Sequence, residues 1–148
     1  MPEIREYTPA RLHSLTPYIA THDPAAAIEW YTEVFGAQLL GDPIVMPDGR
    51  IGHAELQLGA GKLYLAEEFP DIGHVAPSPA GSPVSLVLEV SDVDATAALA
   101  LAAGGQLQGE ISEGYGHRNA TVIDPFGHRW MLQSPVSTGA GGGERDDR

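Results

Sequence analysis

The chain has 148 residues, a net charge of −12 at pH 7, no cysteine and an apolar fraction of 43%. This length suffices for one domain with a sizeable core, and the lack of cysteine excludes disulfides, thiolate nucleophiles and cysteine zinc sites. The few scattered lysines and arginines argue against nucleic acid or an anionic membrane surface as partner. With no long apolar run and no secretory pattern at the start, we expect a cytoplasmic protein.

The chain opens with an arm, a strand and a helix. We interpret residues 1–12 as an N-terminal arm and Leu15–Ala20 as a short strand. Asp23 is a preferred helix N-cap residue and Pro24 a preferred first helical residue. The apolar residues that follow recur at helical spacing, and Gly36 is typical of a helix end. One helix is therefore predicted from Pro24 to the residue before Gly36.

The rest of the first half predicts three strand segments and a linker. The segments are Gln38–Leu40 with Ile44–Met46 as a broken strand, then Ile51–Leu58, then Lys62–Glu67. The last two flank a glycine turn and form a hairpin. Residues 69–82 contain prolines and glycines and are predicted to connect the two halves.

The second half repeats this order of elements. Pro83–Val90 is almost continuously apolar and predicts a buried strand, and Ser91 with Asp94 forms a capping-box pattern before an alanine-rich helix at Ala95–Ala103. A second hairpin follows at Asn119–Gln133, where Asp-Pro-Phe-Gly supplies the turn. Residues 137–148 are predicted to be a disordered tail.

The repeat predicts an α+β fold. Two βαβββ modules, at about 13–68 and 83–136, form a single domain over residues 13–136 with residues 69–82 as linker. One such module cannot cover its own sheet, so we expect a curved mixed sheet around a concave cleft with the helices outside. Clefts of this kind hold small molecules.

A tandem βαβββ repeat that ends in Asp-Pro-Phe-Gly-His-Arg-Trp, here Asp124–Trp130, resembles the vicinal-oxygen-chelate superfamily. This superfamily includes glyoxalase I, extradiol dioxygenases, fosfomycin-resistance enzymes and bleomycin-binding proteins. The likeness covers Leu15–Pro135, and the segments Leu65–Asp71, Gly81–Leu86 and Val90–Ala95 look most like the phosphonate-metabolism-protein-B-like branch. The resemblance implies a homodimer that binds a small molecule.

Metal-using members of the superfamily place one ligand on each of four inward strands. The matching positions in this chain are Thr16, Tyr64, Ser85 and Met131. Histidine and carboxylates are what zinc, nickel, manganese or iron require, and none of these four residues is a strong ligand. We therefore predict no metal site of the superfamily type and no cofactor.

Other polar residues are candidates for the wall of the cleft. His53 and Glu55 share one face of a strand, either as a solvated, hydrogen-bonded pair or as an acid and base facing a cavity. Glu89 falls on the inward face in the register that the resemblance implies. Arg118 could clamp an anion or pair with a local glutamate. The predicted ligand-binding set is Thr16, Tyr18, His53, Glu55, Tyr64, Ser85, Glu89, Tyr115, Arg118 and Met131.

The remaining rings are assigned to structure. Trp30 and Trp130 are predicted to lie in the core. His13, His22, His74 and His128 are predicted to be turn or surface residues, and His128 belongs to the hairpin motif.

Three functions are compatible with these residues. The preferred one is a binding module for a cationic or planar small molecule, of the type that sequesters a drug and gives antibiotic resistance. The second is a lyase or isomerase, with a displaced metal on His53, Glu89 and His117 or with His53 or Glu55 as a metal-free general base. The third is a dimerisation scaffold. The sequence leaves open whether the chain is an enzyme.

Overall fold

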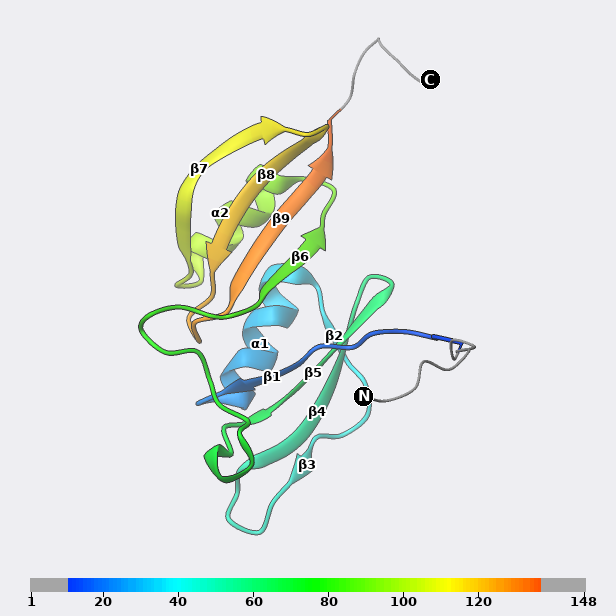
Figure 1. Cartoon of the computed structure of the whole chain (residues 1–148), viewed down its shortest axis with the longest axis vertical. Coiled ribbons are helices and arrows are strands. Elements are labelled where there is room, and N and C mark those ends of the chain that lie inside the picture. The colour runs from blue at the N-terminus through cyan, green and yellow to red at the C-terminus, as the bar shows by residue number, and fades with distance from the viewer. Residues whose placement is uncertain (1–10, 137–148) are drawn as a thin grey trace, which may run out of the picture.

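The computed structural model describes residues 11–136, so most of the predicted arm and the whole predicted tail lie outside the described residues. Within this range two helices and nine strands form two mixed sheets, which confirms the predicted α+β fold of two βαβββ modules. The modules lie one after the other along the length of the molecule, with α1 near their junction (Figure 1). Neither of the two helices is long and apolar enough to cross a membrane.

The first module follows the predicted order of elements. Its helix begins where the sequence indicates: the Asp23 side chain accepts a hydrogen bond from Ala26 N at 3.1 Å, Pro24 is the first helical residue, and Gly36 ends the helix at a φ of 73°. The strand order is β1-β5-β4-β2, and β3 pairs with β4. The elements are β1 Tyr18–Thr21, α1 Pro24–Phe35, β2 Gln38–Leu39, β3 Ile44–Val45, β4 Ile51–Leu58 and β5 Gly61–Glu67.

The linker between the modules contains one short 3-10 helix, η1 Pro70–Ile72. The second module then forms a sheet in the order β6-β9-β8-β7. Its elements are β6 Ser85–Glu89, α2 Val93–Ala102, β7 Gln106–Gly114, β8 His117–Ile123 and β9 Arg129–Pro135.

Two local predictions in the second module are wrong. The N-cap of α2 is Asp92 and not Ser91, because the Asp92 carboxylate accepts the hydrogen bond from Ala95 N at 3.0 Å. The strand β6 is not buried: Val87 keeps 60% of its surface exposed. The reason is that β6 is an edge strand and that α2 covers only one face of its sheet.

The strands are divided between two sheets, and one hydrophobic core joins the modules. Helix α1 packs on its own sheet and also contacts α2. Its Trp30 donates from Nε1 to Ala103 O at 2.9 Å, and Phe35 lies 4.7 Å from Trp130 between ring centroids. Trp30 and Trp130 are 6% and 3% exposed, which confirms that both are core residues.

A buried carboxylate fixes this junction. Asp124, 3% exposed, lies in the turn between β8 and β9 and accepts four hydrogen bonds from neutral groups. Two come from the backbone N–H groups of Phe126 and His128, both at 2.9 Å. The others come from Tyr31 Oη of α1 at 2.5 Å and Trp130 Nε1 at 2.9 Å. A buried charge is tolerated only when it is satisfied in this way, so α1 and the second hairpin hold each other in place.

We expect Asp124→Asn to lower the free energy of unfolding by about 2–3 kcal/mol. The amide of Asn presents donors toward Tyr31 or Trp130, and a buried donor left without an acceptor carries a cost of that size. Urea denaturation followed by tryptophan fluorescence measures the change. The exposed Asp42→Asn is the matched control and should leave the midpoint unchanged; an equal midpoint for both variants would contradict the role of Asp124.

Stability should also fall at alkaline pH through Tyr31. Burial first, and then the Asp124 carboxylate, raises the pKa of Tyr31 well above its ordinary value. A phenol with a raised pKa in the folded state stabilises the fold fully below the unfolded pKa of about 10, and this contribution is lost as the pH rises further. Denaturation at pH 8, 10 and 11 should show that Tyr31→Phe flattens the alkaline fall, whereas Tyr115→Phe, at a fully exposed site, leaves it as steep as before.

Candidate functional site

Each sheet has one face under a helix and one open face. On β4 the buried side chains of Ala54, Leu56 and Leu58 belong to the core, and His53 and Glu55 alternate with them on the opposite side. The pairing of β4 with β5, and of β5 with β1, continues this row of side chains across the sheet. Tyr64 of β5 pairs with Glu55 on one side and with Tyr18 of β1 on the other. The open face of the first sheet therefore carries two tyrosines, a histidine and a glutamate in adjacent strands.

Three of these residues form a chain of hydrogen bonds, which we call the Tyr18–His53–Glu55 relay. The Tyr18 hydroxyl lies 2.7 Å from His53 Nδ1, and His53 Nε2 lies 2.8 Å from Glu55 Oε2. Tyr18 is 46% exposed, whereas His53 and Glu55 are half-buried. Burial first, and then the negative charge of Glu55, raises the pKa of Tyr18, so its phenol stays protonated at neutral pH.

Aromatic rings pack edge to face around this relay. The Tyr18 ring lies 5.3 Å from His53, 5.8 Å from Tyr64 and 5.0 Å from His74, measured between centroids. His74 comes from the linker, and its Nε2 lies 3.2 Å from the carbonyl oxygen of Ile19. Rings in this arrangement hold one another in fixed positions, which keeps the relay geometry defined.

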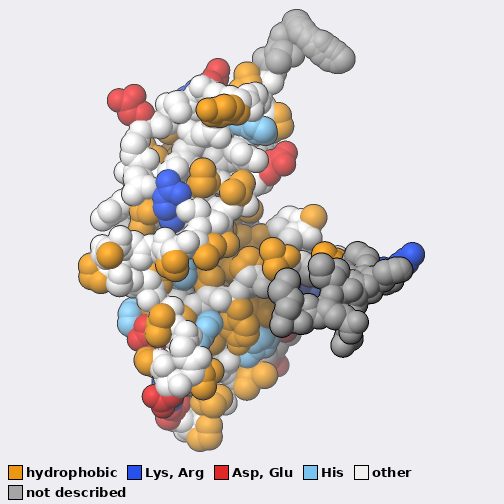
Figure 2. Space-filling model, in the orientation of Figure 1, with side chains coloured by type: hydrophobic (Ala, Val, Ile, Leu, Met, Phe, Trp, Pro, Cys, Tyr) orange, Lys and Arg blue, Asp and Glu red, His pale blue; other side chains and the backbone are white. Residues whose placement is uncertain are grey.

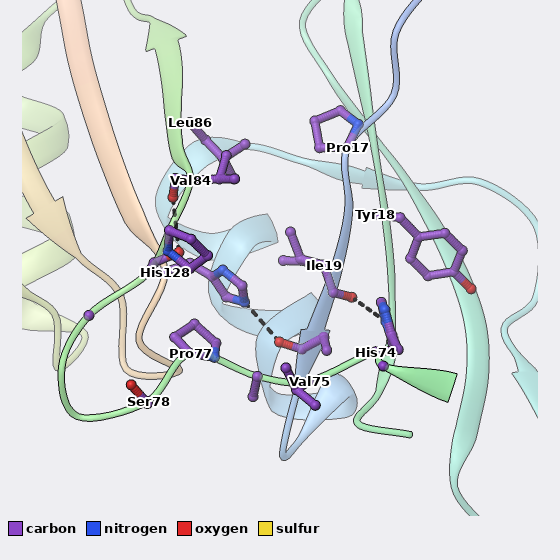
Figure 3. Close-up of a pocket in the computed structure, with 16 residues that line it drawn as sticks. Pro17, Tyr18, Ile19, His74, Val75, Pro77, Ser78, Val84, Leu86 and His128 are labelled. Atoms are coloured by element: carbon purple, nitrogen blue, oxygen red, sulfur yellow. Dashed lines mark hydrogen bonds between the residues drawn. The ribbon is translucent and has the colours of Figure 1, made fainter. Parts of the chain in front are cut away.

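A cavity of about 550 Å³ adjoins the open face. It lies between the edge strands β1 and β6, with Ile19 on one side, Leu86 on the other, and Val75 and Pro77 of the linker below (Figure 3). Tyr18 and His74 form part of its lining, and the Tyr18 ring points away from Ile19 and Leu86 (Figure 3), so the cavity adjoins the relay at Tyr18. Figure 2 shows hydrophobic side chains gathered around this junction, with histidines beside them.

His128 closes the inner end of the cavity and ties the modules together. It is 7% exposed, and its Nε2 lies 2.8 Å from the carbonyl oxygen of Ala20 in β1. The prediction that His128 is a turn or surface residue is therefore wrong in that its side chain is buried. Its structural role at the junction agrees with its place in the hairpin motif.

The open face of the second sheet has a different character. Val87 of β6 and Met131 of β9 are paired in register and are exposed, at 60% and 39%. Arg129 donates from Nη1 to Ser85 Oγ at 2.7 Å and from Nε to Gln108 at 2.8 Å. This face therefore combines apolar surface with one hydrogen-bonded guanidinium.

The structure brings together four residues of the predicted ligand-binding set and separates the rest. Tyr18, His53, Glu55 and Tyr64 share the open face of the first sheet. Thr16 precedes β1, and Ser85, Glu89 and Met131 lie on the second sheet.

Tyr115 and Arg118 lie at the far hairpin of the second module. Tyr115 is fully exposed and, with Gly116, has positive φ values of 54° and 78°, as a tight two-residue turn requires. Arg118 donates from Nε to the Asp94 carboxylate at 3.1 Å and lies 3.5 Å from Glu113. Its guanidinium is thus paired with nearby acidic side chains. This is the second of the two roles considered for Arg118, and not the anion clamp.

The four positions that the resemblance matches to superfamily metal ligands are likewise divided between the modules. Thr16 and Tyr64 belong to the first module, and Ser85 and Met131 to the second. Within residues 11–136, no three histidine, aspartate, glutamate or cysteine side chains lie close enough together to hold an ion. His53 belongs to the first sheet, whereas Glu89 and His117 belong to the second, so the three residues of the displaced-metal alternative do not form a group here.

Two residues of interest were missed by sequence reasoning. Arg129 could have been found, because alternation along β9 places it on the same face as Met131. His74 could not, because it lies in an irregular linker whose path depends on the tertiary structure.

Comparisons with known proteins agree with this fold. A family model for the glyoxalase/bleomycin resistance protein/dioxygenase superfamily matches residues 11–132. An uncharacterized protein of Mycobacterium bovis is 36% identical over 128 residues, which cover 83% of this chain and 84% of that protein. Among solved structures, TioX from Micromonospora sp. ML1 has a TM-score of 0.61 at 28% identity, over 84% of this chain and 97% of that one. TnmS3, an antibiotic binding protein from Streptomyces sp. CB03234, has a TM-score of 0.65 at 24% identity, over 87% of this chain and 100% of that one.

Proposed function

The chain belongs to the glyoxalase/bleomycin resistance protein/dioxygenase superfamily, and on that premise we propose that it binds a small organic molecule, planar or cationic, without a metal ion. The proposed site is the open face of the first sheet together with the adjoining cavity. Its ligand-contacting residues are Tyr18, His53, Glu55 and Tyr64. A cytoplasmic location and membership of the phosphonate-metabolism-protein-B-like branch stay predictions.

The observation that carries this proposal is that the cavity and the relay adjoin each other at Tyr18. A volume of about 550 Å³ falls within the range of small-molecule sites, which are mostly apolar with a few polar groups that fix orientation. Here Ile19, Val84 and Leu86 supply apolar surface, and the Tyr18 and His74 rings lie where the cavity borders the relay. The edge strands β1 and β6 form two sides of the space, and the segment that joins the modules forms most of the remaining wall.

The net charge of the chain, its aromatic side chains and its similarity to TnmS3 support a planar or cationic ligand. The net charge of −12 and the Glu55 carboxylate favour a cation over an anion. The Tyr18 and Tyr64 rings offer aromatic surface to a planar ligand or a cation. TnmS3 is an antibiotic binding protein of the same fold, and drug sequestration is accordingly the role we propose for this chain.

A second candidate function is metal-independent proton abstraction by a lyase or isomerase. The observation that favours it is the Tyr18–His53–Glu55 relay, in which hydrogen bonds of 2.7 and 2.8 Å join a phenol, an imidazole and a carboxylate. A general base needs a titratable group within hydrogen-bond reach of the substrate, and the half-buried His53 or Glu55 would take this role at the open face.

We also propose that the chain forms a homodimer. Exposed apolar side chains, at 60% for Val84, 60% for Val87 and 39% for Met131, lie on or beside the uncovered face of the second sheet. A second copy that covers this face would bury them and would complete the wall of a cleft that one chain leaves open.

Binding is tested with a panel of planar aromatic antibiotics, bleomycin included, by equilibrium dialysis. We expect at least one to bind, and Tyr64→Ala to weaken it about fivefold or more, since removal of a stacked ring costs about 1–3 kcal/mol. Leu99→Ala, at an exposed position on α2, is the control and should bind as the unaltered chain does. Added EDTA should leave the affinity unchanged.

The same experiment separates the two candidate functions. Mass spectrometry of the recovered compound should find it unchanged if the chain only binds. A compound altered by the unaltered chain but not by His53→Phe would favour the enzyme. Affinity that disappears with EDTA would contradict metal-independent binding.

Sedimentation equilibrium tests the dimer. We expect a mass twice that of one chain, and we expect Val87→Glu to shift the equilibrium to monomers, because it places a charge beside Glu89 on the apolar face. Leu99→Glu adds the same charge to the outer surface of α2 and should leave the dimer intact. A monomeric mass for the unaltered chain at high concentration would refute the proposal.

A further inference from the structure

Which atom donates each hydrogen bond of the relay can be deduced by starting from the Glu55 carboxylate. An ionised carboxylate has no proton to donate, so Glu55 accepts and His53 Nε2 carries the hydrogen of the 2.8 Å contact. A neutral imidazole then has its lone pair on Nδ1. The group facing Nδ1 at 2.7 Å is the Tyr18 hydroxyl, and it must therefore be the donor. The alternative acceptor for this proton, the carbonyl oxygen of Gly52, is farther away at 3.3 Å.

The exposed end of the relay is therefore an acceptor. Once the Tyr18 proton points at His53, the phenol oxygen has only lone pairs to offer a ligand. Tyr18 is more exposed than either residue behind it, so its oxygen is the atom of the relay that a ligand on the open face of the first sheet meets.

Two histidines around the cavity also keep a hydrogen-bond acceptor, as the Tyr18 oxygen does. His74 Nε2 faces the carbonyl oxygen of Ile19, and His128 Nε2 faces that of Ala20; a carbonyl only accepts, so each Nε2 carries the proton and each Nδ1 keeps a lone pair. The Ser82 hydroxyl donates to Val84 O at 2.9 Å. Ser78 differs, since its oxygen accepts from Ala80 N at 3.2 Å and its own proton is not directed to a described partner.

We propose that this site selects its ligand by hydrogen-bond polarity: it takes molecules that present an N–H or O–H donor to the Tyr18 oxygen and discriminates against those that present only acceptors. The inference deepens the proposed function and rests on it. The ligand class it names is a planar heteroaromatic or amine with an outward N–H or O–H. A carbonyl, ether or carboxylate at the same place would face lone pairs, and binding it would require breaking the Tyr18–His53 hydrogen bond.

Indole and benzofuran form a matched pair of probes. They have nearly the same size and shape, but indole offers a single N–H donor and benzofuran a ring oxygen that only accepts. Both are titrated into the full chain at pH 8, and backbone amide shifts of β1, β4 and β5 are followed by NMR. We expect indole to bind about fivefold more tightly than benzofuran, the preference that one neutral hydrogen bond provides.

Two variants test the origin of the preference. Tyr18→Phe keeps the ring and removes the accepting oxygen, so the two probes should bind within about twofold of each other. His53→Phe keeps Tyr18 but removes the acceptor for its proton, so Tyr18 becomes free to donate and benzofuran should gain on indole. His22→Phe is the matched control: it makes the same substitution at an exposed histidine that faces Glu68 and not the relay, and the fivefold preference should persist.

The outcomes separate this inference from the proposal on which it rests. If neither probe shifts the amides of β1, β4 and β5, the proposed binding site is wrong and the inference falls with it. If both bind there but benzofuran binds equally well or better, the site stands and the polarity is refuted. A preference for indole that survives Tyr18→Phe would likewise refute it.

Discussion

A single buried carboxylate holds the two halves of this protein in register. Asp124 accepts four hydrogen bonds from neutral donors, and these donors belong to α1 of the first module and to the closing hairpin of the second. An ionised group away from water must have its acceptors filled, so the helix and the hairpin cannot move apart without exposing or orphaning the charge. The aromatic contacts of Tyr31 and Phe35 with Trp130 add apolar burial to the same junction. The contacts around Asp124 thus set where the two modules meet, whereas the relay lies within the first sheet.

The contacts around Asp124 determine which parts of the two sheets lie next to each other. With α1 packed against the second hairpin, His128 reaches the carbonyl oxygen of Ala20 and the edge strands β1 and β6 lie on either side of a cavity. In the part of the chain that the structure describes, neither strand pairs on its outer edge, and the linker passes below them. Tyr18 is consequently presented at the rim by a strand whose other face is fixed in the core. Tyr18 and His53 lie on β-strands that hold them in fixed positions. Fixed positions are needed if the site is to select its ligand by the direction of a hydrogen bond.

Membership of the superfamily limits the possible functions of this chain less than the side chains at the candidate site do. A shared fold hosts both binding proteins and enzymes, so the argument for function must come from the residues at the site. The resemblance assigns the superfamily ligand positions to a threonine, a tyrosine, a serine and a methionine, and our proposal of an organic donor as ligand rests on this and on the hydrogen-bond acceptors at the open face. Within residues 11–136 the relay is the arrangement that favours the alternative, proton transfer.

The sequence by itself determined the local elements, because their causes are local. The caps at Asp23 and Gly36, the two hairpins, and the shared face of His53 and Glu55 follow from residue types and from the two-residue period of a strand. The tandem repeat determined the family in the same way. Sequence patterns did not reveal that Asp124, taken as a turn former, is also the acceptor for Tyr31, nor that the linker brings His74 to Tyr18. They also misplaced the α2 cap by one residue and the exposure of β6. The α2 cap is a local choice between two neighbouring residues, Ser91 and Asp92. The role of Asp124, the position of His74 and the exposure of β6 depend on contacts between residues far apart in the chain, and only the tertiary structure decided them.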